Sequence, residues 1–235
     1  MAGECLTIQR GAQTFSARVS GHGDETVLCL HGFPDTRETF EFQVKALCKA
    51  GFRVVTPVMR GYENSSVSPE GHYYVQDLAE DIIEWINALG GEKVHLVGHD
   101  WGAVTAGAVA ALAPELVGSL SLLAVPYGKH FLTALRVKPS QILKSWYLLF
   151  FQMGTLAEEV VAKNEYEFIE RLWNDWSPGW AYPPEAIQPV KQALAEPGIL
   201  KAVLGYYRCA FQFWSAPGRR SMRILRKPIN VPTMG

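Results

Sequence analysis

Residues 98–103, with the sequence GHDWGA, have the composition of a turn that presents a nucleophile. Small residues flank Asp100 where a sharp strand-to-helix turn leaves no room for side chains, which explains Gly98 and Gly102. A carboxylate at the tip of this turn can attack an electrophilic carbon, and the N-terminus of the following helix favours its negative charge. The simpler alternative is an ordinary helix start with Asp100 as its N-cap.

A second loop, residues 31–34 with the sequence HGFP, supplies the donors that such a nucleophile needs. His31, Gly32 and Pro34 shape this loop, which leaves a neighbouring apolar segment. The backbone N–H of Phe33 can then point at the same place as the N–H of Trp101, so these two amides are predicted to form an oxyanion hole. A His-Gly pair alone is weak evidence, but upstream of GHDWGA it is strong evidence for such an oxyanion hole.

The elements that position these loops follow from hydrophobic patterning. Continuous apolar runs that end in Gly- or Pro-rich loops are typical of strands buried on both faces of a parallel sheet, and they cover residues 26–30, 52–58, 93–97 and 117–125. Helical periodicity between them covers residues 38–50, 74–89 and 101–112. This alternation predicts an α/β fold whose ligands bind at the carboxyl ends of the strands.

The chain changes character after residue 127. Residues 128–217 are helix-like and rich in tryptophan, and an apolar run at 229–234 resumes the strand pattern just before the sequence ends. We therefore expect an α/β core at 1–127, an inserted helical cap at 128–217, and an incomplete return to the core at 218–235. Within the core, Asp81 and Glu84 are expected on the solvent face of their helix, and His99 is expected to be structural.

The composition limits the possible partners. The 235 residues are 48% hydrophobic and 19% charged with a net charge of −1, which suits a globular domain and disfavours nucleic acid as a partner. The basic residues at 219–227 fit a solvated helix face. The four cysteines lack metal-ligand or disulfide spacing, so neither metal nor cofactor is expected. Without a signal-like or membrane-spanning segment, we expect no membrane partner and a cytoplasmic location.

These motifs together resemble the α/β-hydrolase superfamily over residues 20–234. Its soluble epoxide hydrolases are the more specific resemblance, carried by Asp100 in GHDWGA, by the HGFPD loop at 31–35 and by the RGY loop at 60–62. The resemblance implies an α/β-hydrolase fold with a mostly parallel sheet and a helical cap. The substrate implied is a small apolar epoxide.

Epoxide hydrolases place two cap tyrosines over the nucleophile, where the phenols protonate the epoxide oxygen. Residues 145–152, SWYLLFFQ, resemble the first such segment and assign Tyr147. Residues 204–208, LGYYR, resemble the second and assign Tyr207, with Tyr206 as the alternate. An alkoxide leaving group needs such a proton donor. The alternative is that these tyrosines only pack the cap.

The family completes its site with an acid after the next core strand and a histidine after the last one. The sequence ends at Gly235 without residues that match these positions, so C-terminal strands are expected to be missing. Opening of the epoxide by Asp100 needs no base, whereas hydrolysis of the resulting ester does. Because loss of such a base commonly costs on the order of 10⁴–10⁶ in rate, we expect the ester to accumulate.

Two other functions remain open at this point. Haloalkane and haloacid dehalogenases share the Asp nucleophile, but they need N–H donors for a halide. Trp101 could supply one donor, whereas Phe33 occupies the loop position of the second. A non-catalytic ligand-binding protein that keeps the pocket is also compatible with the missing base. The sequence does not determine the oligomeric state.

Overall fold

The computed structural model describes residues 3–128, 137 and 143–235. Its centre is a seven-stranded mixed sheet in the order β1-β2-β4-β3-β5-β6-β7. The strands of its middle and far edge are parallel: β3 (Thr26–Leu30), β4 (Arg53–Pro57), β5 (Val94–His99), β6 (Val117–Leu123) and β7 (Thr233–Met234). The predicted α/β fold with a mostly parallel sheet is thus confirmed.

The sequence analysis missed an antiparallel hairpin at one edge of the sheet. It consists of β1 (Glu4–Arg10) and β2 (Gln13–Ser20), and β2 pairs with β4. In β2, Phe15, Ala17 and Val19 are buried while the residues between them are not. Such alternation belongs to strands with one solvated face, and a search for continuous apolar runs does not detect it.

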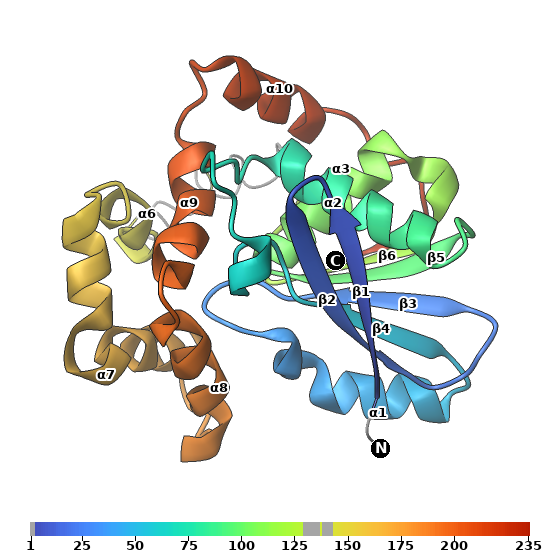
Figure 1. The fold of residues 1–235 in the computed structure, drawn as a ribbon, viewed down its shortest axis with the longest axis horizontal. Coiled ribbons are helices and arrows are strands. Elements are labelled where there is room, and N and C mark those ends of the chain that lie inside the picture. The colour runs from blue at the N-terminus through green and yellow to red at the C-terminus, as the bar shows by residue number, and fades with distance from the viewer. Residues whose placement is uncertain (1–2, 129–136, 138–142) are drawn as a thin grey trace.

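Helices cover both faces of the sheet (Figure 1). One face carries α1 (Glu41–Lys49), which packs against β4. The other carries α2 (Val75–Ala88), α3 (Trp101–Leu112) and α10 (Ala216–Leu225), which pack against one another. The expected helix at 38–50 is in fact a 3₁₀ turn, η1 (Arg37–Phe40), followed by α1. Further 3₁₀ turns are η2 (Asn64–Ser66) and η3 (Pro114–Leu116).

A separate group of helices lies beside one end of the sheet, on the left of Figure 1. We call it the helical group; its members are α6 (Tyr147–Phe150), α7 (Thr155–Trp176), α8 (Pro184–Ala195) and α9 (Ile199–Ala210). The domain boundaries expected at 127/128 and 217/218 stay predictions, and the second of them falls inside α10. Among the described residues, no helix combines the length and apolarity that a membrane crossing requires.

The core contains one buried ionic network, and it shows that the expectation for Asp81 is wrong. The Asp81 carboxylate accepts from Arg60 Nε and Nη2, each at 2.6 Å, and from Arg10 Nη1 at 2.6 Å. The side chains of Asp81 and Arg60 are only 4% and 3% exposed. Both arginines come from segments distant in the sequence, so helical periodicity alone could not show that this position is buried. Glu84 is exposed as expected.

Removal of the Asp81 charge should destabilise the protein strongly. An Asp81→Asn variant leaves the Arg60 guanidinium buried without a counter-charge, and loss of one partner of a buried pair costs about 3–5 kcal/mol. Denaturant unfolding at neutral pH measures this loss. The matched control is Glu84→Gln on the same helix, which should change the free energy of unfolding by less than about 0.5 kcal/mol. Equal effects of the two substitutions would contradict the assignment.

Candidate active site

The turn between β5 and α3 holds Asp100 in a sparsely populated backbone conformation, with φ 53° and ψ −118°. Such a conformation costs free energy and persists only where the surroundings enforce it. Here the surroundings do so by close packing. A Cβ on Gly98 would lie 2.3 Å from the Gly102 carbonyl oxygen, and one on Gly102 would lie 1.9 Å from that of Leu30. Both glycines are therefore required by the close approach of the backbone.

The Asp100 side chain is half-buried, and its carboxylate is held by backbone amides. Phe33 N–H donates to Asp100 Oδ1 at 2.9 Å. Burial raises the pKa of Asp100 to about 6, while the N–H groups of Phe33 and Trp101 act in the opposite direction. The two predicted amides thus act on the carboxylate of the turn. At neutral pH the group is mainly ionised, although it is poorly solvated.

The peptide that joins Gly32 to Phe33 is fixed from its other side. Its carbonyl oxygen, on Gly32, accepts from the Tyr62 hydroxyl at 3.1 Å and lies 3.2 Å from His31 Nδ1. Because His31 Nε2 accepts from Met59 N–H at 3.1 Å, the proton of the neutral ring is on Nδ1 and is donated to Gly32. Burial lowers the pKa of His31 to about 4, which keeps the ring neutral.

This arrangement gives two of the loop residues a physical role. Since a peptide group is planar, hydrogen bonds at the Gly32 oxygen orient and polarise the Phe33 N–H that faces Asp100. Gly32 itself has no room for a side chain, because a Cβ there would lie 2.5 Å from Asp100 Cβ. The contribution of Tyr62 was not predicted. Its only sequence signal was its place in the RGY loop.

The two predicted tyrosines lie on the helical group, close to Asp100. Tyr207, on α9, is buried, and its hydroxyl has no hydrogen-bond partner among the described residues. Its ring packs edge-on against Phe33 and Trp101, with centroids 5.5 and 5.3 Å apart. Tyr147, at the start of α6, lies 6.0 Å from Tyr207 between ring centroids. Burial, and after it the charge of Asp100, raises the pKa of both phenols.

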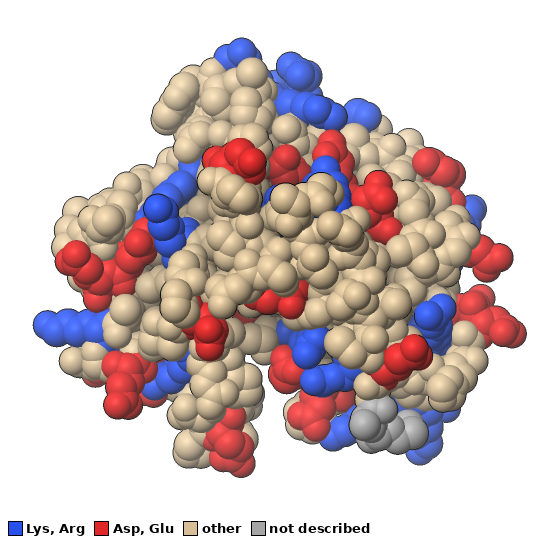
Figure 2. All heavy atoms as spheres, in the orientation of Figure 1, with Lys and Arg blue, Asp and Glu red and all other residues tan. Residues whose placement is uncertain are grey.

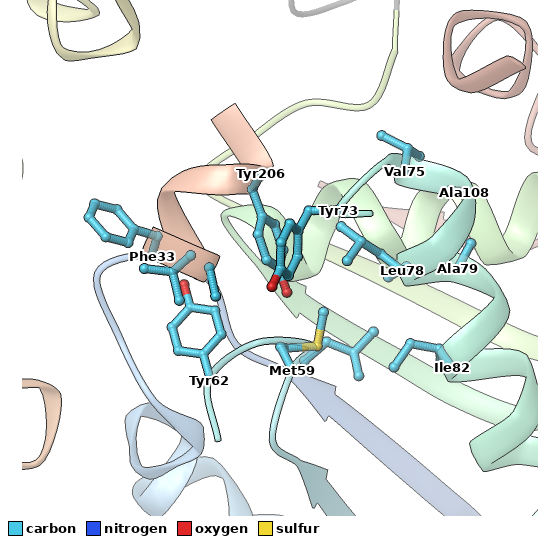
Figure 3. Close-up of a cluster of buried hydrophobic side chains, with 14 of the residues drawn as sticks. Phe33, Met59, Tyr62, Tyr73, Val75, Leu78, Ala79, Ile82, Ala108 and Tyr206 are labelled. Carbon is cyan, nitrogen blue, oxygen red and sulfur yellow. The ribbon is translucent and has the colours of Figure 1, made fainter. Parts of the chain in front are cut away.

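Tyr206 faces in another direction and is already engaged. Its hydroxyl donates to the Arg60 carbonyl oxygen at 2.6 Å, and its ring stacks on Tyr73. Figure 3 shows these two rings side by side, with Tyr62 and Phe33 on the far side of Tyr206 from Val75 and Leu78. Tyr206 therefore links α9 to the core, whereas the hydroxyl of its neighbour Tyr207 makes no such link.

The site also contains a titratable pair to which the sequence analysis gave no role. Asp35 directly follows the HGFP loop, and burial raises its pKa to about 6. Its carboxylate accepts from Thr36 N–H at 2.8 Å. Burial lowers the pKa of His99, which the charge of Asp35 opposes, and His99 Nδ1 is buried without a hydrogen-bond partner among the described residues. The position of Asp35 in the HGFPD motif was the available signal.

The same loop is attached to the helical group. Trp173 Nε1, on α7, donates to the Pro34 carbonyl oxygen at 3.0 Å. Pro34 thus connects the loop that holds the Phe33 amide with α7 of the helical group. Within the described part of the chain, no three His, Cys, Asp or Glu side chains come together as metal ligands.

Comparison with known proteins agrees with this geometry. Residues 25–163 match the family model for the alpha/beta hydrolase fold. The AB hydrolase superfamily protein YfhM of Bacillus subtilis (strain 168) is 32% identical over 208 residues, covering 87% of this chain and 72% of that protein. Epoxide hydrolase 4 of Homo sapiens is 30% identical over 195 residues, covering 80% of this chain; the chain spans only 54% of its length.

Solved structures give the same result. A Bacillus megaterium epoxide hydrolase in complex with an inhibitor superposes with a TM-score of 0.80 at 26% identity, covering 97% of this chain and 80% of that one. The family match covers more than half of the sequence, and the YfhM match most of it. The chain therefore belongs to the alpha/beta hydrolase fold family, of which it is an epoxide hydrolase-like member.

Proposed function

We propose that this protein opens an epoxide through an ester formed on Asp100. The observation that carries the proposal is the position of the Asp100 carboxylate. It accepts from the Phe33 N–H at 2.9 Å, and its charge acts on the phenols of Tyr147 and Tyr207. A carboxylate nucleophile with proton donors close by is what ring opening requires.

In the proposed first step, one Asp100 carboxylate oxygen attacks a ring carbon from the side opposite the breaking C–O bond. The bond electrons move to the epoxide oxygen, which takes a proton from the phenol of Tyr147 or Tyr207. The products are a hydroxyalkyl ester on Asp100 and a tyrosinate. No external base takes part, and the number of protons and electrons in the site is unchanged.

The electrostatics of the site favour this proton transfer as the ring opens. In the free protein the Asp100 charge raises the pKa of both phenols, so they are protonated before the reaction. Formation of the ester neutralises Asp100 and removes that effect. The phenols therefore become more acidic as negative charge develops on the epoxide oxygen, which is stabilisation specific to the transition state.

The proposed second step releases the diol. Water attacks the ester carbon, and the N–H groups of Phe33 and Trp101 stabilise the oxyanion that forms there. The attacking water needs a general base. His31 Nε2 already accepts from Met59 N–H, so His31 is not free to act as this base. Slow turnover of the ester by the 235-residue polypeptide stays a prediction.

The surroundings of Asp100 suggest an apolar substrate. Aromatic rings of Phe33, Trp101, Tyr147 and Phe151 pack around Tyr207, with centroids 4.9 to 6.0 Å from it. A small apolar epoxide, such as an aryl one, would contact these faces. We propose that the helical group acts as the cap over this substrate.

Intact-protein mass spectrometry after incubation with styrene oxide tests the first step. We expect one covalent adduct per chain that Asp100→Ala abolishes. Each of Tyr147→Phe and Tyr207→Phe should slow its formation on the order of 100-fold, since general acid catalysis typically contributes 10²–10⁴. Tyr206→Phe, which removes a phenol from the neighbouring position, serves as the matched control and should have a much smaller effect.

A haloalkane of similar size provides the chemical control for this experiment. Its leaving group is a halide that needs no proton, so its reaction with Asp100 should not depend on the two phenols. If neither Tyr147→Phe nor Tyr207→Phe slows adduct formation from either electrophile, the proposed role of these tyrosines as proton donors is contradicted. Rapid diol formation with many turnovers would instead contradict the predicted slow breakdown of the ester.

Adduct formation should depend on pH through Asp100. Only the carboxylate attacks, and the pKa of Asp100 is about 6. The rate should therefore be constant above about pH 7, half-maximal near pH 6, and fall about tenfold per unit below that. Stopped-time mass spectrometry between pH 4.5 and 8 measures it, with circular dichroism as a check on folding. An Asp35→Asn variant should show the same midpoint in the pH dependence of the rate. If the midpoint is lost in this variant, the pH dependence comes from ionisation of Asp35 and not of Asp100.

Tyr62 should act on the reaction through the Gly32–Phe33 peptide. A Tyr62→Phe variant removes one of the two hydrogen bonds to the Gly32 oxygen, which weakens the Phe33 N–H as a donor to Asp100. We expect slower adduct formation together with a pH midpoint shifted upward by a few tenths of a unit. Tyr74→Phe, which loses a hydroxyl bonded to Gln212 at 2.6 Å, is the control. If the pH midpoint is unchanged in Tyr62→Phe, the Tyr62 hydroxyl does not act on Asp100 and the side chain only contributes to packing.

A further inference from the structure

The charge of this chain is segregated along its sequence. From Pro197 to Gly235 there are seven Lys and Arg residues and no Asp or Glu, although the whole chain has a net charge of −1. Five of these cations fall within nine residues, at positions 219, 220, 223, 226 and 227. The proposed catalytic groups make no use of them. The segregation therefore needs an explanation other than the reaction.

The structure places these five cations on the outer side of α10 and just beyond its end. Gly218, Ser221 and Ile224 are buried at intervals of three, which turns that side of α10 toward α2 and α3. The five cationic residues are all exposed. In Figure 2, Lys and Arg side chains gather at the top of the molecule, over the position of α10. We call this surface the basic face of α10.

Few of these charges are neutralised within the protein. Arg220 lies 3.4 Å from Glu80 on α2, a carboxylate that also pairs with Arg10. Among the described residues this is the one ion pair that involves the basic face. The other helices packed against α10, α3 and α9, contain no acidic residue. An intramolecular role in pairing thus accounts for one of the five cations.

Two large aromatic side chains stand beside the basic face. Phe213 and Trp214, at the corner between α9 and α10, are 58% and 65% exposed and lie edge to face with centroids 5.0 Å apart. Arg219 Nη1 donates to the Trp214 carbonyl oxygen, so the first cation lies directly against the aromatic corner. Apolar side chains that are exposed together, rather than singly, are a feature of interaction surfaces.

We propose that the aromatic corner and the basic face of α10 dock the protein peripherally on an anionic lipid surface. Cationic side chains are attracted to anionic headgroups, while Phe and Trp rings are favoured at the boundary between headgroups and acyl chains. Charge complementarity and the exposed aromatic pair favour this partner over nucleic acid, whose binding would use the cations alone. We expected no membrane partner because the sequence has no membrane-spanning segment. Peripheral binding needs no such segment, so the proposal replaces that expectation.

Sedimentation with vesicles tests the proposal. The 235-residue protein should bind vesicles of phosphatidylcholine containing about one third phosphatidylserine, should not bind phosphatidylcholine alone, and should be released as salt is raised to about 0.5 M. Brominated acyl chains should quench tryptophan fluorescence in the wild type. This quenching should be lost in Trp214→Phe, which keeps an aromatic ring at the corner.

Matched charge reversals locate the surface. Arg223→Glu combined with Arg226→Glu should weaken vesicle binding at least about tenfold, because each surface cation near an anionic membrane contributes about a fivefold factor. Lys45→Glu combined with Lys49→Glu makes the same change in net charge on α1, across the sheet from α10, and should alter binding less than about twofold. Circular dichroism checks that both variants are folded.

Several results would overturn the proposal. The first is an absence of binding to phosphatidylserine vesicles, and the second is an equal loss of vesicle binding in the two charge-reversal variants. The third is binding to heparin or single-stranded DNA with an affinity that matches vesicle binding and that is unchanged when Phe213→Ser and Trp214→Ser are combined. The last result would assign the basic face to a polyanion instead. Adduct formation with dissolved styrene oxide should be unchanged in the α10 variants, so this test and that of the proposed chemistry succeed or fail separately.

Discussion

The hydrogen bond from Phe33 N–H to the half-buried Asp100 carboxylate is the interaction on which the rest of the site depends. Burial raises the pKa of this carboxyl group, and the backbone donors lower it. With them its pKa is about 6, high for an aspartate yet low enough for it to remain ionised near pH 7. The result is a partly desolvated nucleophile that keeps its charge.

The sheet supplies the geometry that this hydrogen bond requires. β3 and β5 are adjacent and parallel, and their register pairs Leu30 with Gly98, so the HGFP loop and the nucleophile turn leave the sheet side by side. The cost of the strained backbone at Asp100 is offset by packing that admits only glycine at positions 98 and 102. A slip of either strand would separate the donor from the carboxylate.

Two consecutive residues of α9 have different roles where the helical group meets this centre. Tyr206 donates to the Arg60 carbonyl oxygen, and Arg60 in turn is bound to Asp81 in the core. Tyr207, about 100° further around the helix, has a hydroxyl with no partner among the described residues. One tyrosine thus fixes the position of the helix while the other keeps a proton that a substrate oxygen could accept.

How far the sequence could predict these features depended on the range of the interactions. The strand at 26–30 and the helix at 101–112 were predicted with their observed bounds, because continuous apolar runs and glycine spacing are local signals. The β1–β2 hairpin was missed because β2 alternates between buried and less buried residues, whereas the prediction relied on continuous apolar runs. Asp81 was misplaced and Tyr62 received no role because their partners, Arg60 and Gly32, are distant in the sequence. The catalytic roles of Asp100, Tyr147 and Tyr207 stay proposals.

The most direct test of the central claim is a titration of the Asp100 carboxyl group by ¹³C nuclear magnetic resonance, with its signal assigned by its loss in Asp100→Asn. Asp35, whose pKa is also about 6, is distinguished by its own Asp35→Asn spectrum. The account predicts an Asp100 midpoint of about 6. A midpoint at the ordinary aspartate value of about 3.9 would show that the carboxylate is well solvated, and would contradict the account of Asp100 as a partly desolvated nucleophile held by backbone amides.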